Sequence, residues 1–252
     1  MLNYLIHIQY DGTAYCGYQL QKNGLGIGEV ILTAAKKIFK EVVDFNGCSR
    51  TDKGVHALDF CVCFKTEMQM KTVNVIKAFN FYLPEDIKVF DCRYVPINFH
   101  ARYDVTSKEY IYKIYNQTYR SPFYDKYMLF YPFPLNLESM NRAAALVCGK
   151  HDFSAFMAAG SKMQDRDCTR TVFYADFTRE GEIITFRISA DGYLYKMVRI
   201  IVGNMLAVSE GKIKEEDITD IIKKEKPSAG MVAPALGLYL NKVYYQSLDN
   251  LF

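Results

Sequence analysis

Apolar and polar side chains alternate along residues 3–10, where tyrosines and isoleucines occupy every second position. A period of two is typical of a β-strand with one buried face. The Asp11-Gly12 pair that follows is a common turn sequence. Similar strand-like segments lie at residues 60–66, 87–95, 108–116, 170–179, 182–189 and 238–246.

Other segments repeat apolar residues every three or four positions, which is the spacing of one helix face. In residues 27–40 the apolar side chains fall together and the lysines fall outside. Helices are likewise predicted over residues 72–82 and 215–225, after Asn136, and from Asp191 to about residue 208. The side chains of Asn136 and Asp191 are suited to cap the first turns of two of these helices.

The order strand, helix, strand, helix, strand in residues 3–95 predicts an α+β unit of the ferredoxin-like kind. Residues 108–246 follow a similar order. We therefore expect the α+β fold class, built from two ferredoxin-like halves. The expected subdomains are residues 1–103 and 104–252, with a joint near residues 98–106.

The composition is that of a globular protein, because half of the 252 residues are hydrophobic and 23% are charged. No apolar run approaches the ~18 residues that a membrane-spanning helix needs. The first residues lack the basic start and long apolar stretch of a secretory signal, so we expect a cytoplasmic location. The net charge of +3 does not by itself require a nucleic-acid partner.

The seven cysteines are scattered and form no Cys-x-x-Cys pair. Cys61 and Cys63 alternate as strand residues do, and no His or Cys pair completes a zinc site by spacing. We therefore expect reduced structural thiols and no metal.

The densest polar cluster occupies residues 48–57, between a predicted helix and a predicted strand. Loops on a rigid scaffold often carry catalytic groups. Arg50 and Asp52 are two positions apart, so in an extended loop their side chains share one side and can pair. An ionised, oriented carboxylate could serve as a nucleophile or a base. By spacing alone, a surface ion pair that closes a turn at Lys53-Gly54 is the simpler interpretation.

The sequence of this cluster carries a further signal. Residues 49–57, SRTDKGVHA, resemble the GRTDAGVHA motif of the TruA family of tRNA pseudouridine synthases. Six further segments resemble other motifs of this family, and they occur in the same order as in the family. These segments are residues 10–19 (YDGT and GYQ), 83–87 (LPEDI), 99–116 (FHAR and KEYIY), 149–156 (GKHDF), 194–203 (LYKMVRIIVG) and 234–240 (PALGLYL). The resemblance therefore covers essentially the whole chain.

The resemblance implies an isomerase that breaks the uridine N1–C1′ bond, turns the uracil and rejoins it through C5. The family's catalytic aspartate matches Asp52. Its carboxylate would attack C1′ of the sugar, attack C6 of the base, or remove a sugar proton, and the sequence leaves these routes open. No redox step or external group is needed, so no cofactor is expected.

The family's stacking tyrosine matches Tyr110, which by itself could equally be a core aromatic of its strand. A target base must leave its RNA stack before a carboxylate reaches it, and a flat ring can then stack against it. Arg199 matches the family's active-site arginine and is expected to position Asp52 or to contact a phosphate; a snorkelling arginine is the alternative. Leu194 and Met197 are expected to line the pocket.

His100 and Arg102 precede the strand of Tyr110, and we interpret them as RNA contacts. His56 could act as a base, but a hydrogen bond that anchors the loop is the simpler interpretation. Lys162, Arg166 and Arg170 form a basic stretch, interrupted by two aspartates, that suits either a phosphate-facing loop or a solvated one.

Two departures from the family pattern bear on the choice of RNA. A family tryptophan is Tyr18 here, and the family's TVQ segment reads Gly26-Ile27-Gly28. Because this segment opens a predicted helix, its amides could contact phosphates. A changed sequence there could indicate a paralogue with another RNA target.

The expected function is thus pseudouridine synthesis at positions 38 to 40 of the tRNA anticodon arm. The resemblance also implies a homodimer with a central, mostly antiparallel sheet. The expected partners are tRNA and a second copy of the chain, with no membrane. Three alternatives stay open: the same chemistry on ribosomal or other RNA, a non-catalytic RNA-binding module, and a metabolic enzyme whose loop matches by coincidence.

Overall fold

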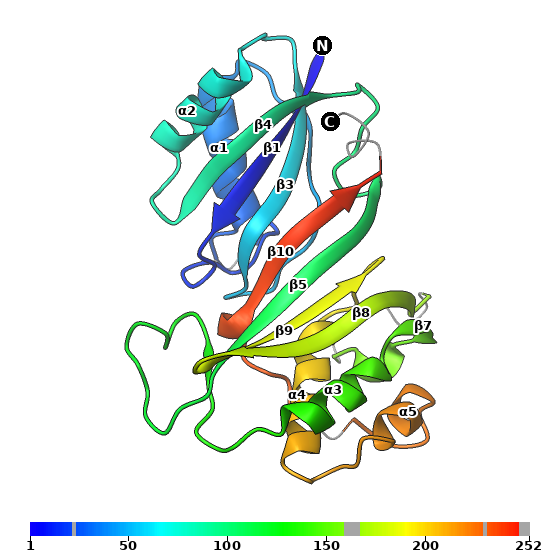
Figure 1. The fold of residues 1–252 in the computed structure, drawn as a ribbon. Helices are drawn as coiled ribbons and strands as arrows, with labels where there is room; N and C mark the ends of the chain where they lie inside the picture. The colour runs from blue at the N-terminus through cyan, green and yellow to red at the C-terminus, as the bar shows by residue number, and fades with distance from the viewer. Residues whose placement is uncertain (22–23, 159–166, 229–230, 247–252) are drawn as a thin grey trace. The chain divides into compact units, whose positions relative to one another are not determined.

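The structure is a computed structural model that describes residues 1–21, 24–158, 167–228 and 231–246. The chain divides into two compact units, each described by itself below. Unit 1 comprises Met1–Thr106 and Tyr239–Phe252, and unit 2 comprises Ser107–Leu238. Figure 1 labels most of the helices and strands of both units.

Unit 1 begins with a β-α-β-β-α-β series. Its elements are β1 (Leu2–Tyr10), α1 (Ile27–Ile38), β2 (Val43–Gly47), β3 (His56–Thr66), α2 (Thr72–Tyr82), β4 (Ile87–Val95) and β10 (Leu238–Tyr245). The strands lie in the order β4-β1-β3, and β2 pairs with β3 as well. These pairings are antiparallel. The series is that of a ferredoxin-like unit, which confirms the predicted class for this half.

Two strands share one edge of β3, the edge that does not pair with β1. β2 pairs with β3 residues 62–65, and β10 pairs in parallel with His56 and Ala57. β10 was expected within the subdomain of residues 104–252, and it lies in unit 1. The reason is the length of β3, which extends past β2 and offers hydrogen-bonding groups at its first residues.

The alternation in β1 creates the core of unit 1. Tyr4, Ile6 and Ile8 are fully buried, and α1 and α2 cover one face of the sheet (Figure 1). Tyr4 stacks on Phe64 at a centroid distance of 5.5 Å, and Phe64 meets Phe79 of α2 at 5.9 Å. Buried aromatic rings of this kind contribute a large apolar area to folding.

Unit 2 repeats part of this arrangement. Its elements are β5 (Val105–Tyr115), β6 (Leu129–Phe130), α3 (Leu137–Ala145), β7 (Gly149–Asp152), η1 (Ser154–Phe156), β8 (Thr169–Glu180), β9 (Ile183–Ala190), α4 (Met197–Ser209), α5 (Asp217–Ile222) and η2 (Ala235–Gly237). The strands lie in the order β5-β9-β8-β7 with antiparallel pairing, and β6 pairs in parallel with β5. β5, β9 and β8 therefore correspond to β1, β3 and β2, as expected for two similar halves.

The predicted helix caps have different outcomes. The Asn136 side chain accepts a hydrogen bond from the Ser139 amide at 3.1 Å, so its role as the cap of α3 is confirmed. The predicted cap at Asp191 is wrong, because α4 begins only at Met197. The Asp191 carboxylate instead accepts from the Thr171 amide at 3.0 Å. None of the helices in the described residues is long and apolar enough to cross a membrane.

Candidate active site

Asp52 lies in the loop between β2 and β3, at the first position of a tight turn. The Val55 amide donates a hydrogen bond to the Asp52 carbonyl at 3.2 Å. Gly54, the third residue of the turn, has a φ of 78°. A positive φ at this position is characteristic of a type II turn and favours glycine. Gly54 therefore fixes the backbone that presents the half-buried Asp52 side chain.

Residues from the end of β1 onward hold this turn in place. The Tyr10 and Thr51 hydroxyls form a buried hydrogen bond at 2.9 Å. The Tyr18 amide donates to the Thr51 carbonyl at 3.2 Å. The motifs at residues 10–19 and 49–57 thus form one piece of structure. Sequence reasoning assigned no role to Tyr10 or Thr51, although a hydroxyl in each motif was an available signal.

His56 anchors the loop, as expected from the sequence. The Gly12 amide lies 3.1 Å from its Nδ1, and the Asp11 carboxylate approaches the same nitrogen at 3.1 Å. Both contacts are made to one ring nitrogen, so residues 11 and 12 after β1 fix the orientation of the imidazole. The buried ring also stacks on Tyr239 at a centroid distance of 4.7 Å.

The Arg50 side chain is exposed and the Asp52 side chain is half-buried. Asp52 is the first residue of the turn, so residues 50–52 precede its two central residues, Lys53 and Gly54. The pairing of Arg50 with Asp52 stays a prediction.

The first amides of α1 are already used within unit 1. The Ile27 amide donates to the Gly17 carbonyl at 3.0 Å, and the Gly28 amide donates to the Tyr18 carbonyl at 2.9 Å. These two amides therefore do not face a phosphate, contrary to the expectation. A Cβ atom at residue 28 would lie 2.8 Å from the Tyr18 carbonyl oxygen. Gly28 thus allows close packing, and this segment supplies no argument for a different RNA.

Tyr110 lies in β5 of unit 2, opposite Ile188 of β9. Its buried ring meets the Tyr193 ring edge to face, with a centroid distance of 4.9 Å and an interplanar angle of 80°. The Tyr193 hydroxyl lies 3.0 Å from the Lys108 carbonyl and 2.9 Å from the Ile188 carbonyl. Burial raises the pKa of Tyr193 well above its ordinary value, so the hydroxyl remains a donor. Tyr193 therefore supports Tyr110, and sequence reasoning did not single it out.

Glu109, the neighbour of Tyr110, is a buried carboxylate that sequence reasoning also missed. It accepts a hydrogen bond from the Tyr174 hydroxyl of β8. It also lies 3.4 Å from the Arg187 guanidinium of β9, and its charge raises the pKa of Arg187. A buried carboxylate needs such partners. These three side chains therefore link β5, β9 and β8 beside Tyr110.

Arg199 lies in the first turn of α4. Its Nε donates to the Ala233 carbonyl at 2.6 Å, and the Ala233 amide donates to the Arg199 carbonyl at 3.1 Å. This reciprocal pair links the start of α4 to the segment before η2. Leu194 and Met197 are buried. Because Tyr193 directly precedes Leu194, the segment that leads into α4 lies beside Tyr110.

His100 and Arg102 lie in a turn after β4, in unit 1. Nδ1 of His100 accepts hydrogen bonds from the amides of Arg102 and Tyr103 at 3.0 and 3.3 Å. The His100 amide donates to the Asp104 carboxylate at 2.8 Å. The Arg102 guanidinium lies 5.9 Å from the centre of the Tyr103 ring, and both side chains are exposed. His100 therefore shapes the turn that presents Arg102 to solvent.

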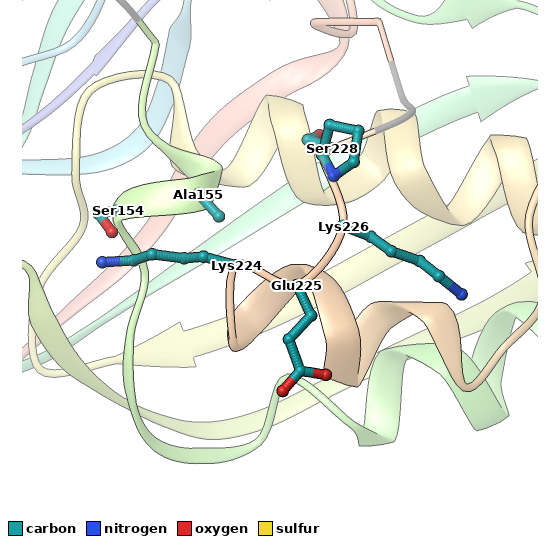
Figure 2. A pocket seen from close by; sticks show the side chains of 7 residues that line it. Ser154, Ala155, Lys224, Glu225, Lys226 and Ser228 are labelled. Carbon is teal, nitrogen blue, oxygen red and sulfur yellow. The ribbon is translucent and has the colours of Figure 1, made fainter.

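A hollow of about 470 Å³ in unit 2 is lined by Ser154, Ala155 and residues 224–228, and by none of the expected site residues. Figure 2 shows Lys224 and Lys226 at this hollow extending in opposite directions. Lys224 pairs with a carboxylate oxygen of Asp152 at 2.8 Å, and Lys226 pairs with one of Asp217 at 2.5 Å. Their charges do not converge on the hollow, so we assign no ligand to it.

The expected site residues divide between the two units. Arg50, Asp52, His100 and Arg102 belong to unit 1, and Tyr110, Leu194, Met197 and Arg199 belong to unit 2. Of the expected basic stretch, Lys162 and Arg166 lie outside the described residues, and Nη1 of Arg170 donates to the Asp167 and Thr169 carbonyls.

Comparison with known proteins identifies the class of protein to which this chain belongs. A family profile described as tRNA pseudouridine synthase matches residues 6–104 and 143–246. The chain is 43% identical over 246 residues to tRNA pseudouridine synthase A of Thermoanaerobacter sp. (strain X514), which covers 97% of this chain and 100% of that protein. The proteins of the same name from Acetivibrio thermocellus and Clostridium acetobutylicum are 42% and 38% identical with the same coverage.

These matches define an isomerase of the pseudouridine synthase class. More specifically, the chain belongs to the tRNA pseudouridine synthase family. The resemblance seen in the motifs is thereby confirmed. Residues 105–142, which include Tyr110, lie between the two segments that match the family profile.

Proposed function

We propose that this protein converts uridine to pseudouridine at positions 38 to 40 of the tRNA anticodon arm, with Asp52 as the catalytic nucleophile. The turn from Asp52 to Val55 is the observation that carries this proposal. It presents a half-buried carboxylate at the position of the family's catalytic aspartate. A group held by a glycine-determined turn needs little reordering before it reacts.

The reaction exchanges one glycosidic bond for another. The N1–C1′ bond breaks, a C5–C1′ bond forms, and the hydrogen at C5 leaves as a proton. The Asp52 carboxylate would bond transiently to C1′, add to C6, or remove a sugar proton. Each route needs an ionised carboxylate held in position. Uridine and pseudouridine are isomers, so the reaction needs no redox partner.

Tyr110 is the proposed stacking partner of the uracil once that base has left the RNA stack. Its edge-to-face contact with Tyr193 supports this role, because a fixed ring loses little freedom when a base stacks on it. Leu194 and Met197 are proposed to line the base pocket. Arg199 is proposed to supply the positive charge that positions Asp52 or binds a phosphate.

Exposed cations and an exposed aromatic ring are the proposed contacts for the rest of the RNA, its phosphates and its bases. Arg50 and Arg102 present guanidinium groups to solvent, and Tyr103 presents a ring beside Arg102. Guanidinium groups bind phosphates and exposed rings stack on bases. His100 contributes by shaping the turn that carries Arg102.

The proposal includes a homodimer that acts in the cytoplasm, as the family resemblance implies. A second chain would extend the surface that one tRNA can contact. Light scattering gives the solution mass directly. A mass near twice the chain's 29.0 kDa supports the dimer, and a mass near 29.0 kDa contradicts it.

The test of the activity is tritium release from tRNA that carries 5-tritiated uridine. Bond formation at C5 expels that hydrogen, so the wild-type protein should release tritium. Asp52→Asn keeps the size of the side chain and removes the carboxylate, and should lower the rate by at least about 10⁴-fold. Asp44→Asn, the same change at an exposed position, is the matched control and should retain the wild-type rate.

Two outcomes contradict the proposal. Asp52→Asn at the wild-type rate would remove Asp52 from the chemistry. No release from tRNA by the wild-type protein, with release from ribosomal RNA, would move the activity to another RNA. Mapping the modified nucleotides then checks positions 38 to 40.

A further inference from the structure

A second cluster of reactive side chains lies in unit 1, away from the Asp52 turn. His7 of β1 is directly opposite Cys61 of β3. Asp59 precedes Cys61 by two positions and therefore shares its face of the sheet. One donor atom from each residue, His7 Nδ1, an Asp59 oxygen and Cys61 Sγ, lies within 4.8 Å of the other two. None of these residues belongs to the family motifs.

The distances within this cluster fit the geometry of a tetrahedral metal ion. Nδ1 lies 2.7 Å from the Asp59 oxygen and 3.5 Å from Sγ, and Sγ lies 3.8 Å from the same oxygen. Bonds of about 2.0 to 2.3 Å to Zn²⁺ hold tetrahedral ligands roughly 3.4 to 3.6 Å apart. Two of the distances already match closely, and the third has to widen by less than about 1 Å.

The chemistry of the three donors selects the kind of ion. A thiolate, a carboxylate and a neutral imidazole together carry two negative charges, which balance a divalent cation. Sulfur and nitrogen ligands favour Zn²⁺ and neighbouring transition metals over Mg²⁺ or Ca²⁺. Three protein ligands are also the number found in zinc sites that keep one open position for water.

Without an ion, the Asp59 oxygen accepts from both neighbours: His7 Nδ1 lies 2.7 Å from it, and the Cys61 thiol donates toward it at 3.8 Å. The other ring nitrogen, Nε2, is buried and finds no hydrogen-bond partner within the described part of the chain. The polar contacts of the ring are therefore made through Nδ1, which is the atom that faces the other two donors.

The cluster is open enough for an ion to enter. The His7 and Asp59 side chains are 12% and 18% exposed, whereas Cys61 is fully buried. The sulfur thus forms the inner end of the cluster, and the carboxylate lies toward solvent. Sequence spacing could not reveal this arrangement, because His7 and Cys61 are 54 positions apart and only the strand pairing brings them together.

We propose that His7, Asp59 and Cys61 form a binding site for a divalent transition metal ion, and that Zn²⁺ fits it best. On binding, the Cys61 thiol releases its proton to solvent, and His7 carries its proton on Nε2 while Nδ1 binds the ion. The ion links β1 to β3 and so stabilises unit 1. This differs from the expectation of no metal that cysteine spacing supported.

Co²⁺ titration of the reduced, chelator-treated, full-length protein tests this site. Co²⁺ occupies zinc sites and shows a thiolate charge-transfer band in the near ultraviolet. We expect one equivalent to bind and Zn²⁺ to displace it. Cys61→Ser should abolish the band, and His7→Gln should weaken binding by at least about tenfold. Cys63→Ser is the matched control, because the same change two positions along β3 leaves all three ligands in place.

The absence of a charge-transfer band in the wild-type protein would overturn the proposal. A band that survives Cys61→Ser would do the same, because another cysteine would then be the ligand. If Cys61→Ser does not fold, His7→Gln decides, and unchanged Co²⁺ affinity in that variant contradicts the site. The titration contains no RNA, so its result is independent of the isomerase activity.

Discussion

The Thr51 carbonyl oxygen occupies the space in which a side chain at residue 17 would begin. A Cβ atom on Gly17 would lie 2.4 Å from that oxygen, and Gly17 has a φ of 95°. Both features require glycine. Because Thr51 directly precedes Asp52, the backbone of Gly17 is the surface against which the Asp52 turn rests.

Gly17→Ala should therefore displace the Asp52 turn. A new methyl group cannot fit against a backbone carbonyl without movement, and a displacement of about 1 Å in a catalytic group can cost about 100-fold in rate. We expect tritium release to fall by at least about 100-fold, and the free energy of unfolding to fall by about 1 to 3 kcal/mol because of the backbone strain. Single-turnover release and urea unfolding measure the two effects.

Gly211→Ala is the matched control for this change. Gly211 also has a positive φ, 68°, but no atom lies within 4 Å of a Cβ atom there. The variant should lose stability through backbone strain and retain the wild-type rate. If Gly17→Ala has the same small effect on the rate as Gly211→Ala, Gly17 does not position the turn.

Local periodicity predicted much of the fold because it reports burial within one element. The helix predicted over residues 72–82 and the strand predicted over 87–95 have the observed bounds of α2 and β4. The start of α4 was predicted too early, since Lys196 has a φ of 60° and interrupts the helix there. Such a backbone reversal leaves no periodic signal. The short strands β2, β6 and β7 were missed because five residues or fewer show too little alternation.

Within the candidate site, the sequence predicted the residues that belong to motifs but not the contacts between them. Asp52 was identified from a motif, and its pairing with Arg50 stays a prediction. Tyr193 was missed because its contact with Tyr110 depends on tertiary structure. Contacts between distant residues follow from strand pairing, which single-sequence patterns do not specify.

Cys92 should make the protein sensitive to alkaline pH. Burial, with a smaller contribution from the Asp91 charge, raises the pKa of this thiol to about 12, against about 9 for an ordinary thiol. Between these values the folded chain keeps a proton that the unfolded chain has lost. The protonated Cys92 thiol therefore makes its full contribution to the free energy of unfolding below about pH 9, and this contribution is lost as the pH rises toward 12.

Thermal unfolding between pH 8 and about 11 measures this effect. The wild-type Tm should fall across the range, and Cys92→Ala should reduce the slope even though its Tm at pH 8 is lower. Cys16→Ala, at a more exposed cysteine, is the control and should keep the wild-type slope. An unchanged slope in Cys92→Ala would mean that this thiol does not hold its proton in the folded state.

Tyr193 should affect the rate through its ring more than through its hydroxyl. Tyr193→Phe keeps the edge-to-face contact with Tyr110 and loses the hydrogen bonds to the Lys108 and Ile188 carbonyls. We expect it to cost about 1 kcal/mol of stability and to leave kcat within about threefold of wild type. Tyr193→Ala removes the ring, leaves Tyr110 unsupported, and should lower kcat by about 10- to 100-fold.

Tyr193→Ala also leaves a cavity, which should lower the free energy of unfolding by about 3 kcal/mol. Its effect on kcat therefore needs a control variant that is destabilised to a similar extent. Phe177→Ala supplies it, because Phe177 packs on Phe186 at a centroid distance of 4.5 Å in the same unit and belongs to no proposed site. Tritium-release kinetics below the unfolding transition of both variants separate the two effects. Equal losses of kcat in Tyr193→Ala and Phe177→Ala would mean that general destabilisation is responsible. A loss of kcat confined to Tyr193→Ala would establish that the Tyr193 ring positions Tyr110, because the two variants are destabilised similarly and differ only in where the cavity lies.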